Sequence, residues 1–267
     1  MDSMKNQRVL TIPTGENFRE LGGYPATNGQ SVKWHKLLRA GHLGLLSKSD
    51  LKTLENYGVR YDVDLRSKPE VDMLADQVET QSIEYIFDPV FKEDATDNSK
   101  TPAEMKDLLE SHPTYGRDHM ENVYRSMINT EHCRQAFYKL FQILLKNHEN
   151  DQAVLFHCTA GKDRTGMSAT FILSALGVDQ KTIEEDYLLT NQVSKPVIDA
   201  RLEKAKKEGY TEPALKSLRF LYSVSPDFFN AAMDEINKLY GGMKQFLHRG
   251  IGLTDNDIKK LRKIYLE

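Results

Sequence analysis

Apolar residues recur along the chain with two different periods, and each period predicts a different kind of element. Residues 59–65 alternate between apolar and polar side chains, which predicts a half-buried strand. A second strand candidate spans 82–90, and the acidic stretch 93–98 that follows it is expected to be an exposed loop. The short apolar run 153–157 is expected to be a fully buried strand.

Helical spacing and capping residues predict helices through most of the remaining chain. Ser47, with Asp50 three residues later, predicts the start of a helix that ends at Gly58. Small and apolar residues fill 165–176, and Gly177 just beyond them is a typical C-cap, so we expect a buried helix there. Further helices are predicted at 133–147, 181–189, 195–208, 213–224, 227–239 and 254–265.

The order of these elements predicts the fold class. Strands alternate with helices through the first two thirds of the chain, which is typical of an α/β protein with a central sheet flanked by helices. The last third is almost entirely helical and adds helical insertions to that core. A chain of 267 residues without internal repeats is expected to form a single domain, residues 1–267.

Composition narrows the possible functions. The net charge is −3, so the molecule as a whole lacks the basic character of a nucleic-acid-binding protein. Two cysteines are too few for a disulfide framework and fit a reducing compartment. The first ten residues are polar and mixed in charge, and no apolar run approaches the roughly 20 residues of a membrane span. We therefore expect a cytoplasmic protein, with secretion after removal of a signal as the alternative.

The sequence also predicts that neither a metal nor a nucleotide cofactor is needed. It contains no glycine-rich phosphate-binding string of the Gly-x-Gly-x-x-Gly or Walker type, so we expect no nucleotide cofactor. Several histidines lack the spacing of metal ligands, so we expect no metal. These histidines are His112, His119, His132 and His148.

The segment 157–166 carries the strongest chemical signal in the chain. A buried strand ends at Cys158, a short loop follows, and Arg164 opens a buried helix. The loop amides can form a concave nest for an anion, and the helix adds its positive end to the same place. The Arg164 guanidinium can grip two phosphate oxygens, while the same field favours a reactive Cys158 thiolate. This arrangement predicts phosphate binding and nucleophilic catalysis.

A cysteine, five residues, then Arg164 and Thr165 resemble the phosphate loop of the protein tyrosine phosphatase superfamily. The fuller Cys-x-x-Gly-Lys-Asp-Arg-Thr string is similar to one bacterial branch, which includes secreted phosphatases of pathogens. Members of that branch act on phosphotyrosine, and some also act on phosphoserine, phosphothreonine and phosphoinositides. Three further segments are similar to motifs of the branch, although Glu20 stands where the first motif usually has Asp. These segments are 17–23, 64–67 and 241–262.

The resemblance implies a role for each residue of the loop and for some residues outside it. It implies that Cys158 is the nucleophile and that Arg164 binds phosphate. It also implies that His157 orients the loop and supports the thiolate. Substrate-binding residues implied by the loop are Thr159, Ala160, Gly161, Lys162 and Thr165, and the supporting residues are Arg19, Asp64 and Arg66.

The identity of the general acid stays open at this point. The resemblance favours Asp163, which lies inside the loop and is ranked first because a proton donor must reach the leaving oxygen. Asp88, before a proline, and Asp118, in the polar stretch before the cysteine, are the alternatives. Asp163 has a structural alternative of its own, an ion pair with Arg19 or Arg66 that braces the loop.

The sequence thus predicts a protein tyrosine phosphatase that works through a cysteinyl-phosphate intermediate on phosphotyrosine proteins or peptides. The alternatives are a phosphoinositide phosphatase with the same mechanism, a phospho-ligand binding module without turnover, and a rhodanese-type sulfurtransferase. The helical segment 181–224 follows the phosphate-loop helix directly and is expected to be an insertion or lid. In related phosphatases a helical cover lies there, and we expect it to limit oxidation of Cys158.

Overall fold

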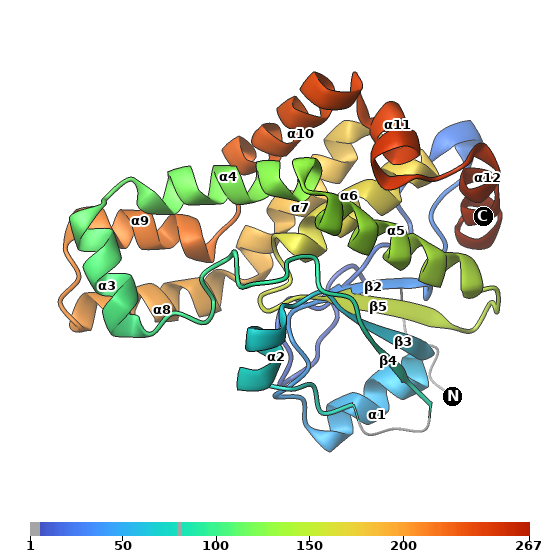
Figure 1. The fold of residues 1–267 in the computed structure, drawn as a ribbon. Helices are drawn as coiled ribbons and strands as arrows, with labels where there is room; N and C mark the ends of the chain where they lie inside the picture. Colours follow the sequence, from blue (N-terminus) through green and yellow to red (C-terminus); the bar gives the residue numbers. More distant parts are fainter. Residues whose placement is uncertain (1–5, 79–81) are drawn as a thin grey trace.

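The computed structural model describes residues 6–78 and 82–267, and its centre is a five-stranded sheet with helices on both faces (Figure 1). The spatial order is β1-β2-β5-β3-β4, so the last strand in sequence lies in the middle. β1 runs antiparallel to β2, and the other neighbouring strands are parallel. The strands are β1 (Arg19–Glu20), β2 (Leu37–Ala40), β3 (Val59–Asp64), β4 (Glu84–Phe87) and β5 (Ala153–His157).

The position of β5 at the centre of the sheet explains why residues 153–157 are all apolar or buried. All five of its residues are buried, because β2 and β3 flank it and helices cover the sheet. The strands predicted at 59–65 and 153–157 are confirmed, and β4 occupies the middle of the predicted 82–90 segment. Because β5 is central and parallel to its neighbours, its carboxyl end opens at the edge where such folds place their ligands.

Twelve α-helices surround the sheet in the described ranges, together with a 3₁₀ turn and a π-helix at Phe246–Ile251. The helices predicted from spacing and caps are confirmed, whereas α2, α3 and α4 had not been predicted. The helices are α1 (Lys48–Tyr57), α2 (Lys68–Met73), α3 (Pro102–Ser111), α4 (Tyr115–Asn129), α5 (Glu131–Lys146), α6 (Arg164–Leu176), α7 (Gln180–Val193), α8 (Lys195–Lys207), α9 (Glu212–Tyr222), α10 (Pro226–Tyr240), α11 (Met243–Gln245) and α12 (Asp255–Tyr265).

Local capping chemistry sets several of these helix ends. The Ser47 side chain accepts a hydrogen bond from the backbone N–H of Asp50 at the start of α1, as predicted. α6 ends at Gly177, which has a φ of 86° and donates its N–H to carbonyls of the last turn. Thr101 and Glu104 form a capping box at the start of α3, a signal that the sequence already contained.

The helices form two layers and one projecting group. α1 and α2 lie on one face of the sheet, while α5, α6 and α7 lie on the other (Figure 1). α3 and α9 pack against α4, α8 packs against α9, and this group extends beyond the sheet at one end. One continuous cluster of buried apolar side chains runs from the sheet into α8 and α9. None of the helices in the described part of the chain combines the length and apolar character that crossing a bilayer requires.

The acidic stretch 93–98 is a loop, as predicted, but only its two ends, Glu93 and Asn98, are exposed. It was expected to be an exposed loop, but Thr96 is only 8% exposed and its hydroxyl accepts a hydrogen bond from Arg164. Asp94 accepts hydrogen bonds from Thr96 and from the backbone of Ser99, so the polar residues satisfy one another. The loop therefore forms part of the wall of the site, because Thr96 contacts Arg164. Hydrogen bonds from Thr96 and Ser99 to Asp94 hold the loop in this position.

Candidate active site

The phosphate loop joins β5 to α6 and is almost entirely buried. Cys158 follows directly after β5, and Arg164 is the first residue of α6; each is 2% exposed. Gly161 has a φ of 66°, and a Cβ at this position would lie 2.4 Å from the carbonyl oxygen of Ala40. Only glycine therefore lets the loop turn this close to the end of β2.

The environment of Cys158 favours its thiolate. Burial by itself opposes ionisation, but the Arg164 charge lowers the pKa of the Cys158 thiol below its usual value. The backbone and the hydroxyl of Thr165 add to this lowering, and that hydroxyl has no other hydrogen-bond partner in the described ranges. Asp163 acts in the opposite direction. The balance leaves a nucleophilic sulfur at the positive end of α6.

Arg164 is held by Glu70 of α2, a residue that the sequence analysis did not identify. The two guanidinium Nη atoms donate to the two carboxylate oxygens of Glu70, each at 2.6 Å. Thr159 and Ser67 donate to the same carboxylate. Burial would raise the pKa of Glu70, but these partners, led by Arg164, lower it to about 2. Glu70 thereby fixes the guanidinium plane, while Arg164 Nε has no partner among the described residues and is available to a phosphate oxygen.

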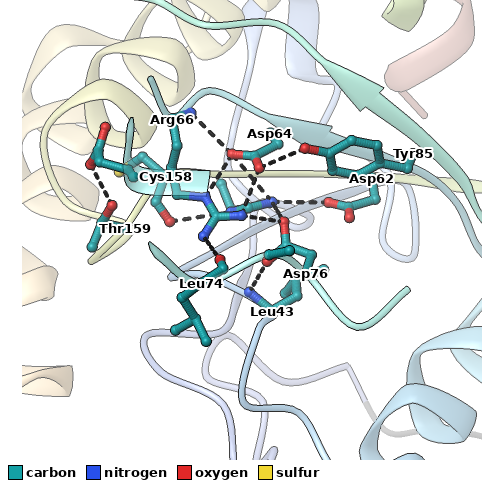
Figure 2. Close-up of polar contacts among 12 residues, drawn as sticks. Leu43, Asp62, Asp64, Arg66, Leu74, Asp76, Tyr85, Cys158 and Thr159 are labelled. Carbon is teal, nitrogen blue, oxygen red and sulfur yellow. Dashed lines mark hydrogen bonds and ion pairs between the residues drawn. The ribbon is translucent and has the colours of Figure 1, made fainter. Parts of the chain in front are cut away.

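A second cluster of charges lies beneath the loop (Figure 2). Arg66 donates to both carboxylate oxygens of Asp64, at 2.9 and 2.7 Å, and to Asp76 at 2.7 Å. His157 Nε2 lies 3.1 Å from an oxygen of Asp62 and 3.1 Å from one of Asp76. Burial would lower the pKa of His157, but the surrounding carboxylates raise it well above its usual value. The carboxylates of this cluster therefore favour the protonated imidazole.

The cluster could also hold a metal by proximity, since one ligand atom from each of Asp62, Asp76 and His157 lies within 4.8 Å of the others. The oxygen of Asp76 that faces His157 is already bound by Arg66, and its other oxygen accepts a hydrogen bond from the backbone N–H of Leu43. These contacts identify an ion-pair network. His157 Nδ1 lies 3.2 Å from the carbonyl oxygen of Cys158, so the network holds the backbone of the nucleophile.

The opposite side of the loop is held by residues from the amino-terminal third. Asn17 donates its side-chain N–H groups to the carbonyls of Ala160 and Gly161, at 3.2 and 2.9 Å. Arg39 donates to the Gly161 carbonyl at 3.0 Å and pairs with Asp186 of α7 at 2.6 Å. The loop is thus tied both to the first motif and to α7.

Two residues of the first motif lie away from the phosphate loop. Arg19 donates to the backbone of Asp186 and to the hydroxyl of Thr190, each at 2.8 Å, so it supports α7 and only indirectly the loop. Glu20, which stands where the branch usually has Asp, accepts hydrogen bonds from the backbone of Gly22 and His35. Its carboxylate therefore holds a local turn next to β1.

Asp163 has partners other than those expected. The ion pair with Arg19 or Arg66 is not formed; Asp163 pairs with Lys162 at 2.7 Å and accepts a hydrogen bond from the Tyr124 hydroxyl at 2.8 Å. The expectation failed because Arg19 and Arg66 are bound by other groups. Lys162 is only 6% exposed, so its charge is directed at Asp163 in this state of the loop.

The two other candidate acids lie away from the phosphate loop. Asp118 is exposed in the first turn of α4. Asp88 is buried after β4, and its carboxylate lies 3.4 Å from Lys139 Nζ. Burial raises the pKa of Asp88 to about 6, although Lys139 lowers it. In the described ranges, neither side chain has a hydrogen bond or ion pair to residues 158–164.

A cavity of about 320 Å³ lies beside the loop, between α3, α8 and α9. Thr159 is its one lining residue from the phosphate loop, and Arg201 and Lys204 of α8 bring positive charge to it. Tyr210 and Tyr222 supply aromatic walls. Helices α8 and α9, within the predicted 181–224 insertion, therefore border the approach to the loop, whereas α7 is fixed to it through Asp186.

Several residues that hold the site were missed from the sequence, and some left a signal. Ser67-x-x-Glu70 is a capping-box pattern, and the structure forms that box, so Glu70 could have been placed at the start of a helix. Its role toward Arg164 could not have been read from this pattern. Asn17 lies in the first motif, but its hydrogen bonds to the loop could not be read from that motif, and Arg39 and Tyr124 carried no local signal.

Comparison with known proteins identifies the family. The family model described as "Tyrosine phosphatase family" matches residues 10–267. A Cupriavidus necator protein named among the tyrosine-protein phosphatases is 28% identical over 264 residues, covering 99% of this chain and 90% of that protein. The triple specificity protein phosphatase PtpB of Mycobacterium tuberculosis is 25% identical, covering 97% of this chain and 99% of PtpB. A tyrosine-protein phosphatase of Nostoc commune is 26% identical, covering 89% of this chain and 76% of that protein. The chain therefore belongs to the tyrosine phosphatase family, which confirms the phosphatase activity and the fold class predicted from its sequence.

Proposed function

We propose that this phosphatase hydrolyses phosphotyrosine through a covalent intermediate on Cys158. The Sγ–P bond forms as the bond from phosphorus to the tyrosine oxygen breaks, and an acid gives its proton to that oxygen. Water then attacks the cysteinyl-phosphate, which releases inorganic phosphate and restores the thiolate. The observation that carries this proposal is the lowered pKa of the Cys158 thiol beside Arg164 at the start of α6.

Binding and charge stabilisation are assigned to the loop itself. The backbone N–H groups of residues 159–164 and the free Nε of Arg164 would hold the equatorial phosphate oxygens. Thr165 would stabilise the sulfur when it leaves phosphorus in the second step, since it already interacts with the thiol. Arg66 and Asp64 are assigned a positioning role through His157.

Asp163 remains the proposed acid, and its partners suggest how it would be controlled. Its carboxyl group pairs with Lys162 and accepts a hydrogen bond from Tyr124, and these two contacts fix its position in the loop. A dianionic phosphate entering the loop would draw the Lys162 ammonium toward itself. Asp163 would then be released from this ion pair and would be free to turn toward the leaving oxygen, to which the general acid must donate.

The burial of the nucleophile supports phosphotyrosine as the substrate class. Cys158 is 2% exposed, so a phosphoryl group must be carried below the surface, which suits the long, flat tyrosine side chain. Phosphoinositides are the second candidate, because Arg201 and Lys204 line the cavity that adjoins Thr159 and could bind additional phosphates. The relative PtpB is named for triple specificity, which fits a site that accepts more than one substrate.

We further propose that residues 1–267 act as one phosphatase domain and that α8 and α9 form its cover. The apolar cluster that is continuous from the sheet into these helices supports one domain. The cavity between α3, α8 and α9 supports a cover that borders the loop and shields Cys158 from oxidants. Shortening 195–222 to a linker should speed inactivation by peroxide; equal rates in a folded, active variant would contradict the shielding role.

The nucleophile is tested with Cys158→Ser and p-nitrophenyl phosphate. We expect turnover to fall more than about a hundredfold, because serine is not ionised near neutral pH. Binding of inorganic phosphate should persist, since the loop amides and Arg164 remain. Turnover above about a hundredth of the wild-type value would contradict the assignment, and unchanged circular dichroism is the control for folding.

The acid is tested by comparing two leaving groups in Asp163→Asn. A phosphotyrosine peptide needs a proton on its leaving oxygen, whereas p-nitrophenyl phosphate needs one far less. We expect the peptide to be slowed at least about tenfold more than the nitrophenyl ester. Equal slowing of both substrates would show that Asp163 braces the loop and would make Asp88 the better candidate.

The substrate class is tested with phosphotyrosine, phosphoserine and phosphothreonine peptides beside phosphoinositides of increasing phosphate number. The variants Arg201→Ala and Lys204→Ala should weaken hydrolysis of phosphoinositides more than that of the phosphotyrosine peptide. Loss of phosphotyrosine hydrolysis alone would place these side chains in peptide binding instead.

A further inference from the structure

A second cavity lies at the far end of α6 from the phosphate loop. Its volume is about 580 Å³, within the range typical of small-molecule sites, and it lies between α6, α7, α10, the π-helix and α12. The proposed catalysis uses none of its residues. Its walls are mainly apolar, and the side chains that form them include Val178, Ile183, Phe229, Met233, Leu247 and Ile258.

Positive charge is concentrated among the polar residues of this cavity. Lys244, Lys259 and Arg262 line it, and the first two side chains have no hydrogen bond or ion pair within the described ranges. Arg262 donates its Nε–H to the carbonyl of Ala175, at the end of α6, which points its guanidinium at the cavity wall. The acidic lining residue Asp255 lies 3.4 Å from the ring of His248. The remaining field at the rim therefore favours an anion.

The cavity walls are held in place by aromatic contacts. The π-helix, an uncommon element that is frequent at functional sites, carries Phe246 on its buried side. The Phe246 ring packs 5.1 Å from that of Phe171 in α6 and 5.1 Å from that of Tyr240 in α10. This stack fixes the π-helix against two helices that line the cavity, so the space between them is formed before any ligand arrives.

We propose that this cavity binds a single-chain amphiphile with an anionic head, such as a fatty acid. The apolar walls would bury the acyl chain, and Lys244 and Lys259 would bind the head at the rim. A small inorganic anion would leave the apolar walls in contact with water, and an uncharged chain would leave the rim cations without a partner. The apolar walls and the cationic rim together therefore favour a ligand that has both an apolar chain and an anionic head. The proposal is independent of the phosphatase mechanism.

Laurate, used below its micelle concentration, tests the proposal by titration calorimetry and by displacement of anilinonaphthalene sulfonate. We expect saturable binding with one site per chain, and no binding of acetate, which has the head without the chain. A lysophosphatidate with the same chain distinguishes a phosphate head from a carboxylate head. Binding of either amphiphile supports the site, and binding of neither overturns it.

Two neighbouring lysines of α12 provide a matched comparison. Both side chains are exposed on α12, but Lys259 lines the cavity and Lys260 does not. We expect Lys259→Glu to weaken laurate binding about fivefold or more, and Lys260→Glu to change it less than about twofold. Equal effects of the two substitutions would show that only general charge attraction is involved and would overturn the site.

Filling the cavity provides a second test that does not depend on charge. Met233→Trp should reduce laurate binding while p-nitrophenyl phosphate turnover, measured at the opposite end of α6, reports that the protein is folded. Full laurate binding by this active variant would place the ligand elsewhere. Retention of the wild-type protein on anionic vesicles, without binding of monomeric laurate, would identify the rim as a membrane contact and also contradict the proposal.

Discussion

Charged residues are arranged in opposite ways around the phosphate loop and along α8. Near the loop, Arg66 and Asp64 form an ion pair whose side chains are 1% and 0% exposed. On α8, the Lys195 and Asp199 side chains of an ion pair are 69% and 43% exposed. The buried pair exchanges water for fixed partners and cannot rearrange without leaving a charge in the interior. The exposed pair gives little stability, because water and salt compete for it.

This difference indicates which side chains are held rigidly and which can rearrange. Arg164 needs one orientation to bind phosphate, and a buried carboxylate from α2 supplies it through two short contacts. The helices that border the adjoining cavity carry surface pairs between residues four apart, which leave the side chains free to adapt to a substrate.

Removing a buried cation should have the largest effect on stability. Arg66→Met removes a guanidinium that pairs with Asp64 and Asp76, whose other basic partner among the described residues is His157. We therefore expect the free energy of unfolding to fall by about 3 kcal/mol or more. The urea midpoint measures this change, and p-nitrophenyl phosphate turnover should fall with it. A loss below about 1 kcal/mol would mean that the network is not needed to hold the loop.

Acid should weaken the same region. Glu70 has a pKa of about 2 in the folded protein against a usual value of 4.5. Because the folded protein stabilises the ionised form of Glu70, this residue contributes to the free energy of unfolding above pH 4.5, its usual pKa. The contribution is lost as the pH falls from 4.5 to about 2, its pKa in the folded protein. Urea unfolding across this range measures the slope. Glu70→Gln should flatten it, and an unchanged slope would assign the decline to other carboxylates.

Changing the phosphate-binding cation should act mainly on catalysis. Arg164→Lys keeps the charge but loses the planar fork, so catalytic efficiency should fall at least about tenfold, roughly 1.4 kcal/mol. Steady-state kinetics with p-nitrophenyl phosphate measures the loss. Near-wild-type kinetics in this variant would place Arg164 outside the phosphate site.

The surface pair gives the smallest expected effect and serves as the control for Arg66→Met. Lys195→Met removes one partner of the exposed pair on α8, and we expect the free energy of unfolding to change by less than about 0.5 kcal/mol. The same urea titration measures it. A loss comparable to that of Arg66→Met would remove the contrast between buried and exposed charges.

Features that depend on residues close together in the chain could be predicted from the amino-acid sequence alone. The strand at 153–157, the helix that follows the loop and the start of α1 all depend on periodicity or on caps within one turn. The phosphate loop belongs to this class, because its cysteine and arginine are only six residues apart. The family and the reaction followed from that local string.

The side chains that hold the loop come from distant parts of the chain, and the folded structure is needed to identify them. Glu70 and Arg164 are separated by 94 residues, and Arg39 and Gly161 by 122, so no local pattern links them. The hydroxyl of Tyr124 donates to the carboxylate of Asp163, which lies 39 residues later in the chain. Tyr124 belongs to α4, a helix that was not predicted from the sequence. Buried polar groups take whichever partners the packed chain brings within hydrogen-bonding distance, and that distance is set by the packing of sheet and helices. For this reason Arg19 and Arg66 have partners other than Asp163.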